Sequence, residues 1–233
     1  MSGRTKLEKF AANLDFPNVF ENYDYEKPQL FVGHKQPINY KSNWKKIFFK
    51  NEFPLVLELA CGRGEYSLGL AQINPELNII GIDIKGARIW KGASNSLLND
   101  LQRVAFVRSK IEVIDHFFGP EEIDEIWITF PDPFPRPTKS NKRLISNFYL
   151  DIYSKILRNG ALINFKTDDP ELFDFGLKTI QGREDFKLLY QNKDIYSKPL
   201  FMEALEIKTY YEKMHLQKGR TIKFLQAIYN KKS

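Results

Sequence analysis

From residue 55 onward the sequence alternates short apolar runs with longer amphipathic segments, and this order limits the fold more than any other feature. The apolar runs have the length of buried strands, and the segments between them have helical periodicity. We expect strands at residues 55–59, 78–83, 104–108, 126–130, 161–166, 186–190 and 221–229. We expect helices at residues 65–74, 85–99, 111–118, 146–157, 170–181 and 202–217. This alternation predicts an α/β fold, a mostly parallel sheet with helices on both faces.

The chain length of 233 residues fits one α/β domain with a short addition. Residues 1–50 are aromatic and basic without clean periodicity, so we expect an N-terminal arm that packs on a main domain at residues 51–233. Lys and Arg outnumber Asp and Glu by 35 to 29, which gives a net charge of +6 and favours a polyanionic partner.

Several classes of protein are disfavoured by what the sequence lacks. No apolar stretch approaches the length of a membrane span, and the N-terminus lacks the apolar run of a secretory signal. Cys61 is the single cysteine, so an internal disulfide and a cysteine-rich zinc site are excluded. The three histidines are scattered, and we expect no metal. The default expectation is a cytoplasmic protein, as a monomer or a homodimer.

A glycine-containing loop follows the first predicted strand, and an acid ends the second. Gly62 and Gly64 allow the backbone to turn sharply and to approach a ligand closely. Ligands of open α/β sheets bind outside the carboxyl ends of the strands, so we expect Asp83 to accept hydrogen bonds from the ribose hydroxyls of a nucleoside. Tyr66 stands where a dinucleotide-binding loop has its third glycine, and Glu58 would repel a phosphate. A carboxylate at Glu58 suits a cationic methionine moiety, which favours S-adenosylmethionine over NAD.

A proline-rich loop follows the fourth predicted strand. Four prolines between residues 131 and 137 restrict its backbone, so we expect a stiff loop that holds Asp132, its only acid, against a substrate. The alternative is a loop that only ends the strand and caps the next helix. The run at residues 136–143 carries four basic side chains and no acid. Because it lies beside the presumed reaction centre, we expect Lys139, Lys142 and Arg143 to contact RNA phosphates.

Two later acids are less informative by themselves. Asp168 follows the fifth predicted strand and is expected close to the proline-rich loop, but Asp168 or Asp169 could simply cap the next helix. Glu212 lies among basic and aromatic residues, where a surface charge on an amphipathic helix is the ordinary interpretation.

In chain order these motifs resemble those of the bacterial tRNA (guanine-N7-)-methyltransferase family. The matching segments are Glu58-Leu59-Ala60-Cys61-Gly62-Arg63-Gly64, Ile82-Asp83, Phe130-Pro131-Asp132-Pro133-Phe134, Phe165-Lys166-Thr167-Asp168 and Thr209-Tyr210-Tyr211-Glu212. The resemblance covers about residues 50–230. It implies a Rossmann-like class I methyltransferase fold and transfer of a methyl group from S-adenosylmethionine to N7 of guanine 46 in tRNA.

The resemblance also implies roles for individual residues. Glu58 and Asp83 correspond to cofactor ligands, beside the loop glycines Gly62 and Gly64. Asp132 corresponds to the active-site carboxylate, also near the cofactor. The positions that correspond to substrate binding are Arg136, Asp168, Thr209, Tyr211 and Glu212, and residues 138–143 match an RNA-contacting run.

The sequence departs from the family pattern at three places. Phe134 stands where the family usually has tryptophan, and Arg136 where it usually has lysine. Lys110 stands near the place of an acid or asparagine that holds the adenine amino group, and a lysine cannot accept a hydrogen bond.

Methylation at guanine N7 makes modest chemical demands. N7 carries a lone pair and no proton, so a direct displacement needs alignment rather than a general base. Asp132 and Asp168 are our candidates to accept the N1–H and amino protons of guanine and to favour the positive charge that develops on the purine. Two alternatives stay open: methylation of an exocyclic amine of adenine or cytosine, and a non-catalytic RNA-binding module.

Overall fold

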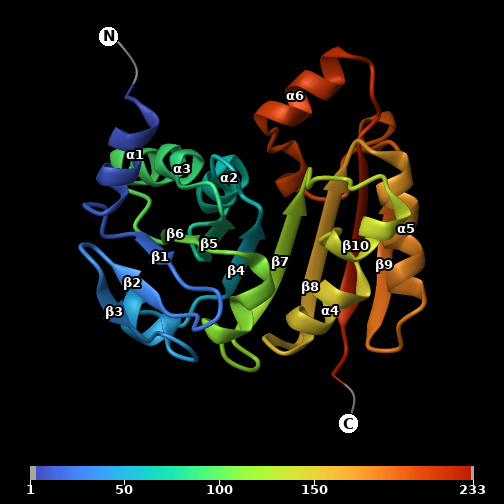
Figure 1. Cartoon of the computed structure of the whole chain (residues 1–233). Coiled ribbons are helices and arrows are strands. Elements are labelled where there is room, and N and C mark those ends of the chain that lie inside the picture. The colour runs from blue at the N-terminus through green and yellow to red at the C-terminus, as the bar shows by residue number, and fades with distance from the viewer. Residues whose placement is uncertain (1–3, 232–233) are drawn as a thin grey trace. The chain divides into compact units, whose positions relative to one another are not determined.

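The computed structural model describes residues 4–231, which form two compact units. The first unit ends at Gly119, and the second begins at Pro120. Each unit contains strands paired in a sheet and helices that cover it (Figure 1).

The sheet of the first unit has the strand order β3-β2-β1-β6-β5-β4. The strands are β1 (Val19–Asn22), β2 (Leu30–Val32), β3 (Gln36–Ile38), β4 (Leu55–Leu59), β5 (Asn78–Asp83) and β6 (Val104–Arg108). The β4–β5, β5–β6 and β1–β6 pairs are parallel, whereas β2 and β3 add an antiparallel hairpin. The N-terminal segment therefore extends the sheet through β1.

The helices of the first unit lie on both faces of this sheet. They are α1 (Lys6–Asn13), the π-helical turn η1 (Trp44–Phe49), α2 (Glu65–Ile73), α3 (Gly86–Leu98) and the 3₁₀ helix η2 (Ile111–His116). On one face, α1 packs on α3, where the Asn13 amide donates to the Gly86 carbonyl. On the other, Phe20 of β1 meets Trp44 edge-to-face at 5.1 Å between ring centroids. Successive strand side chains point to opposite faces, so Glu21 lies on the α1 side.

The sheet of the second unit has the order β7-β8-β10-β9. The strands are β7 (Ile123–Thr129), β8 (Leu157–Thr167), β9 (Phe186–Asn192) and β10 (Lys223–Tyr229). β7 and β8 are parallel, and β10 is antiparallel to both β8 and β9. The helices are α4 (Asn147–Ser154), α5 (Pro170–Gln181), α6 (Tyr210–Gln217) and the 3₁₀ helices η3 (Pro137–Lys142), η4 (Ile195–Ser197) and η5 (Glu203–Glu206).

The structure confirms the α/β fold with its mostly parallel sheet, and it corrects two elements. The helix predicted at residues 146–157 ends at Ser154, and β8 already begins at Leu157. Gly160, at φ +82°, lies where the pairing of β7 with β8 shifts register, so it marks an irregularity within the strand rather than a helix end.

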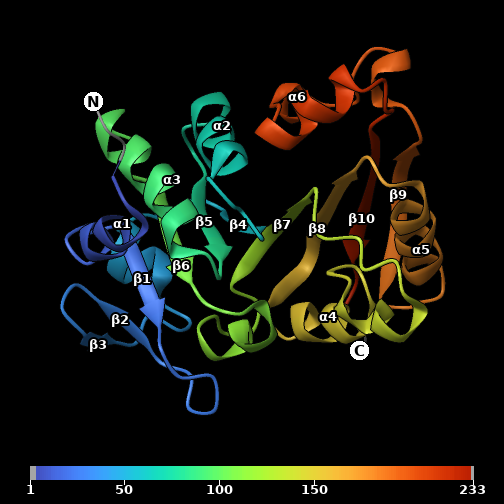
Figure 2. The same cartoon turned by 45° about the horizontal axis from the view of Figure 1, so that its top comes forward.

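The helix predicted at residues 202–217 is interrupted. It consists of η5 and α6, and Thr209 is the extended N-cap residue between them. The interruption has a tertiary cause, because the backbone carbonyls of Leu205 and Ile207 accept hydrogen bonds from the Lys166 ammonium. Both views place α6 beyond the carboxyl end of β8 (Figures 1 and 2).

Among residues 4–231, no helix is both long enough and apolar enough to cross a lipid bilayer.

Candidate functional site

The loop after β4 turns through three residues with left-handed backbone. Ala60, Gly62 and Gly64 have φ values of +56°, +56° and +67°. A Cβ atom on Gly64 would lie 2.5 Å from the Phe106 ring, so only glycine fits there. A Cβ atom on Gly62 would meet nothing within 4 Å, which leaves open space beside its backbone. The loop is thus packed on one side and open at Gly62.

Glu58 is buried in β4 and fixes the helix that follows the loop. Its Oε2 atom accepts hydrogen bonds from the backbone N–H of Ser67, at 2.8 Å, and from the Ser67 hydroxyl. Ser67 is the third residue of α2, so the carboxylate lies near a helix N-terminus, where negative charge is favoured.

Asp83 ties the same loop to the end of β5. One carboxylate oxygen accepts from the Gly62 N–H at 2.9 Å, and the other accepts from the Lys85 N–H at 2.7 Å. Each oxygen keeps a second lone pair, so the carboxylate can still accept from a ligand hydroxyl.

The pKa of Cys61 reflects the charges that surround the loop after β4. Cys61 is buried, and burial raises the pKa of its thiol well above the ordinary value. The charges of Glu58 and Asp83 raise it further. Two carboxylates therefore act on one short loop, and their field favours a cationic ligand.

The end of β6 offers no acid to hold an adenine. Lys110 is exposed, and its ammonium lies 4.1 Å from the centroid of the Tyr25 ring. The neighbouring Ser109 is buried and accepts a hydrogen bond from the Asn22 amide. Lys110, which cannot accept a hydrogen bond, thus stands near the place where an acid or asparagine was expected to hold the adenine amino group.

In the second unit, the loop after β7 has strained backbone on both sides of Asp132. Phe130 and Phe134 have φ values of +50° and +42°. A side chain in this conformation costs about 1–2 kcal/mol, and such strain concentrates at functional sites. Asp132 itself is exposed. The stiff loop expected from the prolines therefore presents its only acid to solvent.

The three cations predicted to contact RNA fall into two groups. Lys139 and Lys142 are exposed on η3, and Arg136, just before it, is exposed as well. Arg143 is buried: its guanidinium donates to the carbonyls of Pro133 and Phe134 and lies 4.5 Å from the Phe175 ring centroid. The donors of Arg143 thus hold the Asp132 loop, and its contact with RNA stays a prediction.

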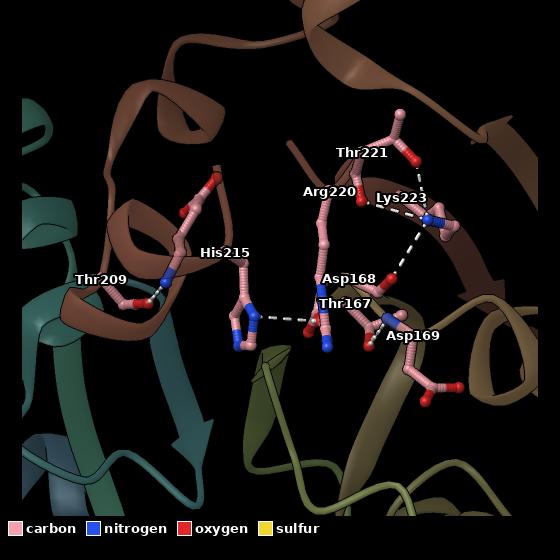
Figure 3. Close-up of polar contacts among 9 residues, drawn as sticks. Thr167, Asp168, Asp169, Thr209, His215, Arg220, Thr221 and Lys223 are labelled. Carbon is pink, nitrogen blue, oxygen red and sulfur yellow. Dashed lines mark hydrogen bonds and ion pairs between the residues drawn. The ribbon is translucent and has the colours of Figure 1, made fainter. Parts of the chain in front are cut away.

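Asp168 lies between Arg220 and His215 at the end of β8. Its Oδ2 atom lies 2.6 Å from Arg220 Nη1 and 3.2 Å from His215 Nδ1, and Figure 3 shows the carboxylate between these side chains. The helix-capping role falls to Asp169, whose side chain accepts from the Leu172 N–H.

The start of α6 lies beside the same strand end. The Thr209 hydroxyl accepts from the Glu212 N–H at 3.1 Å and so caps the helix (Figure 3). Glu212, interpreted from sequence alone as a surface charge, is instead completely buried against the Lys166 ammonium at 2.9 Å. Tyr196 adds a hydrogen bond to Glu212 at 2.6 Å. Of the predicted positions in this stretch, only Tyr211 is exposed.

The second unit thus brings Asp168, Thr209 and Glu212 together around the end of β8, and the sequence missed the groups that hold them. Burial lowers the pKa of Lys166, and the charge of Glu212 opposes that effect. A lysine at the end of an otherwise apolar strand was the available signal for this pair. His215 and Arg220, the partners of Asp168, carry no comparable signal. No cluster of three metal-ligating side chains occurs within residues 4–231.

Comparisons with known proteins cover most of the chain. A family model described as a putative methyltransferase matches residues 52–225. A tRNA (guanine-N(7)-)-methyltransferase of Bacteroides fragilis is 42% identical over 226 residues, which is 97% of this chain and 86% of that protein. The protein of the same name from Porphyromonas gingivalis is 43% identical over 211 residues, covering 90% of this chain and 84% of that one.

Solved structures support the fold. The 16S rRNA methyltransferase KamB superposes with a TM-score of 0.60 at 12% identity, covering 90% of this chain and 99% of that one. The 16S rRNA (adenine(1408)-N(1))-methyltransferase from Catenulisporales acidiphilia gives a TM-score of 0.58 at 14% identity, covering 82% and 94%. At these identities the likeness concerns the class I methyltransferase architecture alone.

Proposed function

The chain belongs to the tRNA (guanine-N(7)-)-methyltransferase family, and from this premise we propose that it transfers a methyl group from S-adenosylmethionine to N7 of a guanine in tRNA. The observation that carries the proposal is the 42% identity to an enzyme of that name over 97% of the chain. Guanine 46 is the expected target.

The loop of the first unit suits the cofactor. S-adenosylmethionine supplies a methyl carbon on a positively charged sulfur atom. The open space beside Gly62 admits a ligand to the backbone, and the field of Glu58 and Asp83 favours its positive charges. We assign the ribose hydroxyls to the free lone pairs of Asp83, with Gly64 shaping the turn.

The acids of the second unit suit the base. Guanine presents N1–H and an amino group, both donors, on the edge away from N7. We propose that Asp132, on its stiff loop, accepts from this edge as the catalytic carboxylate, and that Asp168, placed by Arg220 and His215, offers a second acceptor. A carboxylate here orients the base and stabilises the positive charge that the purine acquires. No general base is needed, because N7 carries no proton.

The exposed side chains suit the rest of the tRNA. Lys139, Lys142 and Arg136 form a basic surface for phosphates. Tyr211 offers an exposed ring on which a base can stack, and Thr209 and Glu212 fix the segment that carries it. We propose a cytoplasmic enzyme, monomeric or homodimeric, that uses no metal, because displacement at N7 calls for alignment alone.

The test is to incubate the chain with tRNA and S-adenosylmethionine and to identify the product by nucleoside mass spectrometry. We expect 7-methylguanosine, lost in Asp132→Ala while tRNA binding persists; Glu171→Ala, an exposed acid on α5, is the control. A methyl group on an exocyclic amine would identify the rival reaction. Absence of S-adenosylmethionine binding by calorimetry would leave only an RNA-binding module.

A further inference from the structure

The loop that carries Asp132 is poor in hydrogen-bond donors. Of residues 131–135, three are prolines, which have no backbone N–H, so only Asp132 and Phe134 can donate from the backbone. Every residue of the loop nevertheless has a carbonyl oxygen. The start of the loop is tied to the sheet, because the Phe130 N–H donates to the Lys166 carbonyl at 2.8 Å. Beyond that point, the loop carbonyls need donors from other parts of the chain.

Arg143 supplies such donors to the end of the loop. Its Nε atom lies 3.0 Å from the Pro133 carbonyl oxygen and 3.3 Å from the Phe134 carbonyl oxygen, and its Nη2 atom lies 3.2 Å from the latter. These carbonyls belong to the peptide groups on either side of the Phe134 α-carbon, whose φ of +42° is a strained conformation. Arg143 thus holds the strained backbone that directly follows Asp132.

The guanidinium is itself held in place by packing. Arg143 is 8% exposed, and its guanidinium carbon lies 4.5 Å from the centroid of the Phe175 ring on α5. In the chain it precedes the buried Leu144 and Ile145, and the Tyr153 hydroxyl donates to the Leu144 carbonyl at 3.0 Å. A group so placed has little surface left for a phosphate and is suited to fixing the backbone beside it.

We propose that Arg143 is a positioning residue for methyl transfer, which fixes the loop so that the Asp132 carboxylate meets the guanine edge. The proposal rests on the function proposed above, in which Asp132 accepts from that edge. Alignment matters here, because a displacement of about 1 Å can lower a rate by about a hundredfold. The competing role for Arg143 is the phosphate contact expected from the sequence, as for its exposed neighbour Lys142.

The first experiment separates turnover from binding and from stability. We expect Arg143→Gln to lower kcat by about tenfold to a hundredfold, with the KM values for tRNA and S-adenosylmethionine within about twofold of the parent chain. The matched control is Arg183→Gln, because the Arg183 guanidinium is also largely buried and lies near the Phe186 ring, but pairs with Asp151 and Asp185 instead of the loop. Urea unfolding should show a loss of stability in both variants, whereas kcat should fall only in Arg143→Gln.

The second experiment asks whether Arg143 acts through Asp132. Asp132→Asn keeps one side-chain acceptor for the base, so we expect a slow rate that tritiated-methyl transfer can still measure. In that background Arg143→Gln should change kcat by less than about twofold, because the carboxylate that Arg143 positions is already absent. An equal fold loss with and without the Asp132 carboxylate would overturn the proposal, since it would show a purely structural effect.

A third variant, Arg143→Lys, distinguishes the loop from a phosphate as the partner of the cation. An ammonium can replace a guanidinium at a phosphate, but it lacks the planar fork that reaches two carbonyls at once. We therefore expect kcat in Arg143→Lys to stay close to that of Arg143→Gln. Parent-like kcat in Arg143→Lys, together with a salt dependence of tRNA binding that falls only in Arg143→Gln, would assign Arg143 to a phosphate and overturn the proposal.

The two proposals fail separately, because the loop can be observed without the reaction. The amides of Asp132 and Phe134 report the mobility of the loop through their heteronuclear NOE. If no 7-methylguanosine forms but these amides become mobile in Arg143→Gln and not in Arg183→Gln, Arg143 holds the loop and only the reaction is lost. If 7-methylguanosine forms and neither kcat nor these amides respond to Arg143→Gln, only the positioning role is lost.

Discussion

The ammonium of Lys166 lies 2.9 Å from the Glu212 carboxylate, and neither side chain is exposed to solvent. The same ammonium donates to the carbonyls of Leu205 and Ile207 at 3.1 Å. The Lys166 side chain at the end of β8 thus fixes both the segment before α6 and Glu212 inside α6. Because Thr209 and Tyr211 lie between Ile207 and Glu212, the contacts of Lys166 position the proposed tRNA-binding residues.

We predict that Lys166→Met lowers the free energy of unfolding by about 3–5 kcal/mol, because it leaves the Glu212 charge buried without its partner. The double variant Lys166→Met/Glu212→Gln should lose less than Lys166→Met alone, since no unpaired charge remains. Urea unfolding of the four chains of this double-mutant cycle measures the coupling. Strictly additive losses would show that the two charges do not stabilise one another.

We predict that Glu125 makes the fold less stable as pH rises. Burial raises its pKa to about 7 from an ordinary value of 4.5. Between these values the unfolded chain is ionised while the folded chain holds its proton, so the free energy of unfolding falls with increasing pH and levels off above about 7. The full effect is about 3 kcal/mol.

The matched variant is Glu125→Gln, whose carbonyl can still accept the hydrogen bond from the Asn164 amide. It should match the parent chain in unfolding free energy at pH 4 and exceed it at pH 8. Parallel pH profiles for the two chains would mean that Glu125 is ionised in the fold throughout.

The strands were the most predictable part of the fold. β4, β5 and β6 begin and end at the predicted residues, because each is an apolar run with both faces buried. β1 was missed because its place beside β6 depends on a pairing with residues far along the chain. Similarly, the continuous helix predicted over residues 202–217 ignored the tie to Lys166, which no local pattern reveals.

The candidate site was predictable where a residue directly follows a strand of the parallel sheet, because ligands of such sheets bind at the carboxyl ends of the strands. Gly62 and Asp83 follow strands of the parallel sheet, and the structure joins them by a hydrogen bond. Charge alone was a poorer guide. Arg143 belongs to the same basic run as Lys139 and Lys142, yet the sequence could not show that Phe175 and two carbonyls cover its guanidinium.

We predict that this difference appears in the salt dependence of tRNA binding. Lys139→Gln/Lys142→Gln removes two exposed cations, so the slope of log affinity against log salt should fall by about 2. Arg143→Gln should leave the slope unchanged and lower the free energy of unfolding by about 1–3 kcal/mol, because the buried carbonyls lose a donor. A slope lowered by Arg143→Gln in a chain of unaltered stability would instead support the phosphate contact predicted for Arg143 from the sequence.

We predict that glycine is better tolerated than alanine at position 134, although glycine is the more flexible residue. Phe134 has φ +42°, a conformation that strains any residue with a Cβ atom. Phe134→Gly and Phe134→Ala both remove the ring, so their difference isolates the backbone. We expect the glycine variant to be more stable by up to about 1 kcal/mol in urea unfolding.

The control is Phe148, which is exposed on the helix α4. There the order should be opposite, and the alanine variant should have a free energy of unfolding higher than that of the glycine variant by roughly 0.5–1 kcal/mol. At position 134 the more stable variant should also be the less active one. The relaxed glycine loop holds Asp132 less firmly, so Phe134→Gly should methylate tRNA more slowly than Phe134→Ala at saturating substrate. If the more stable variant is also the faster one, the strain beside Asp132 does not serve to fix that carboxylate.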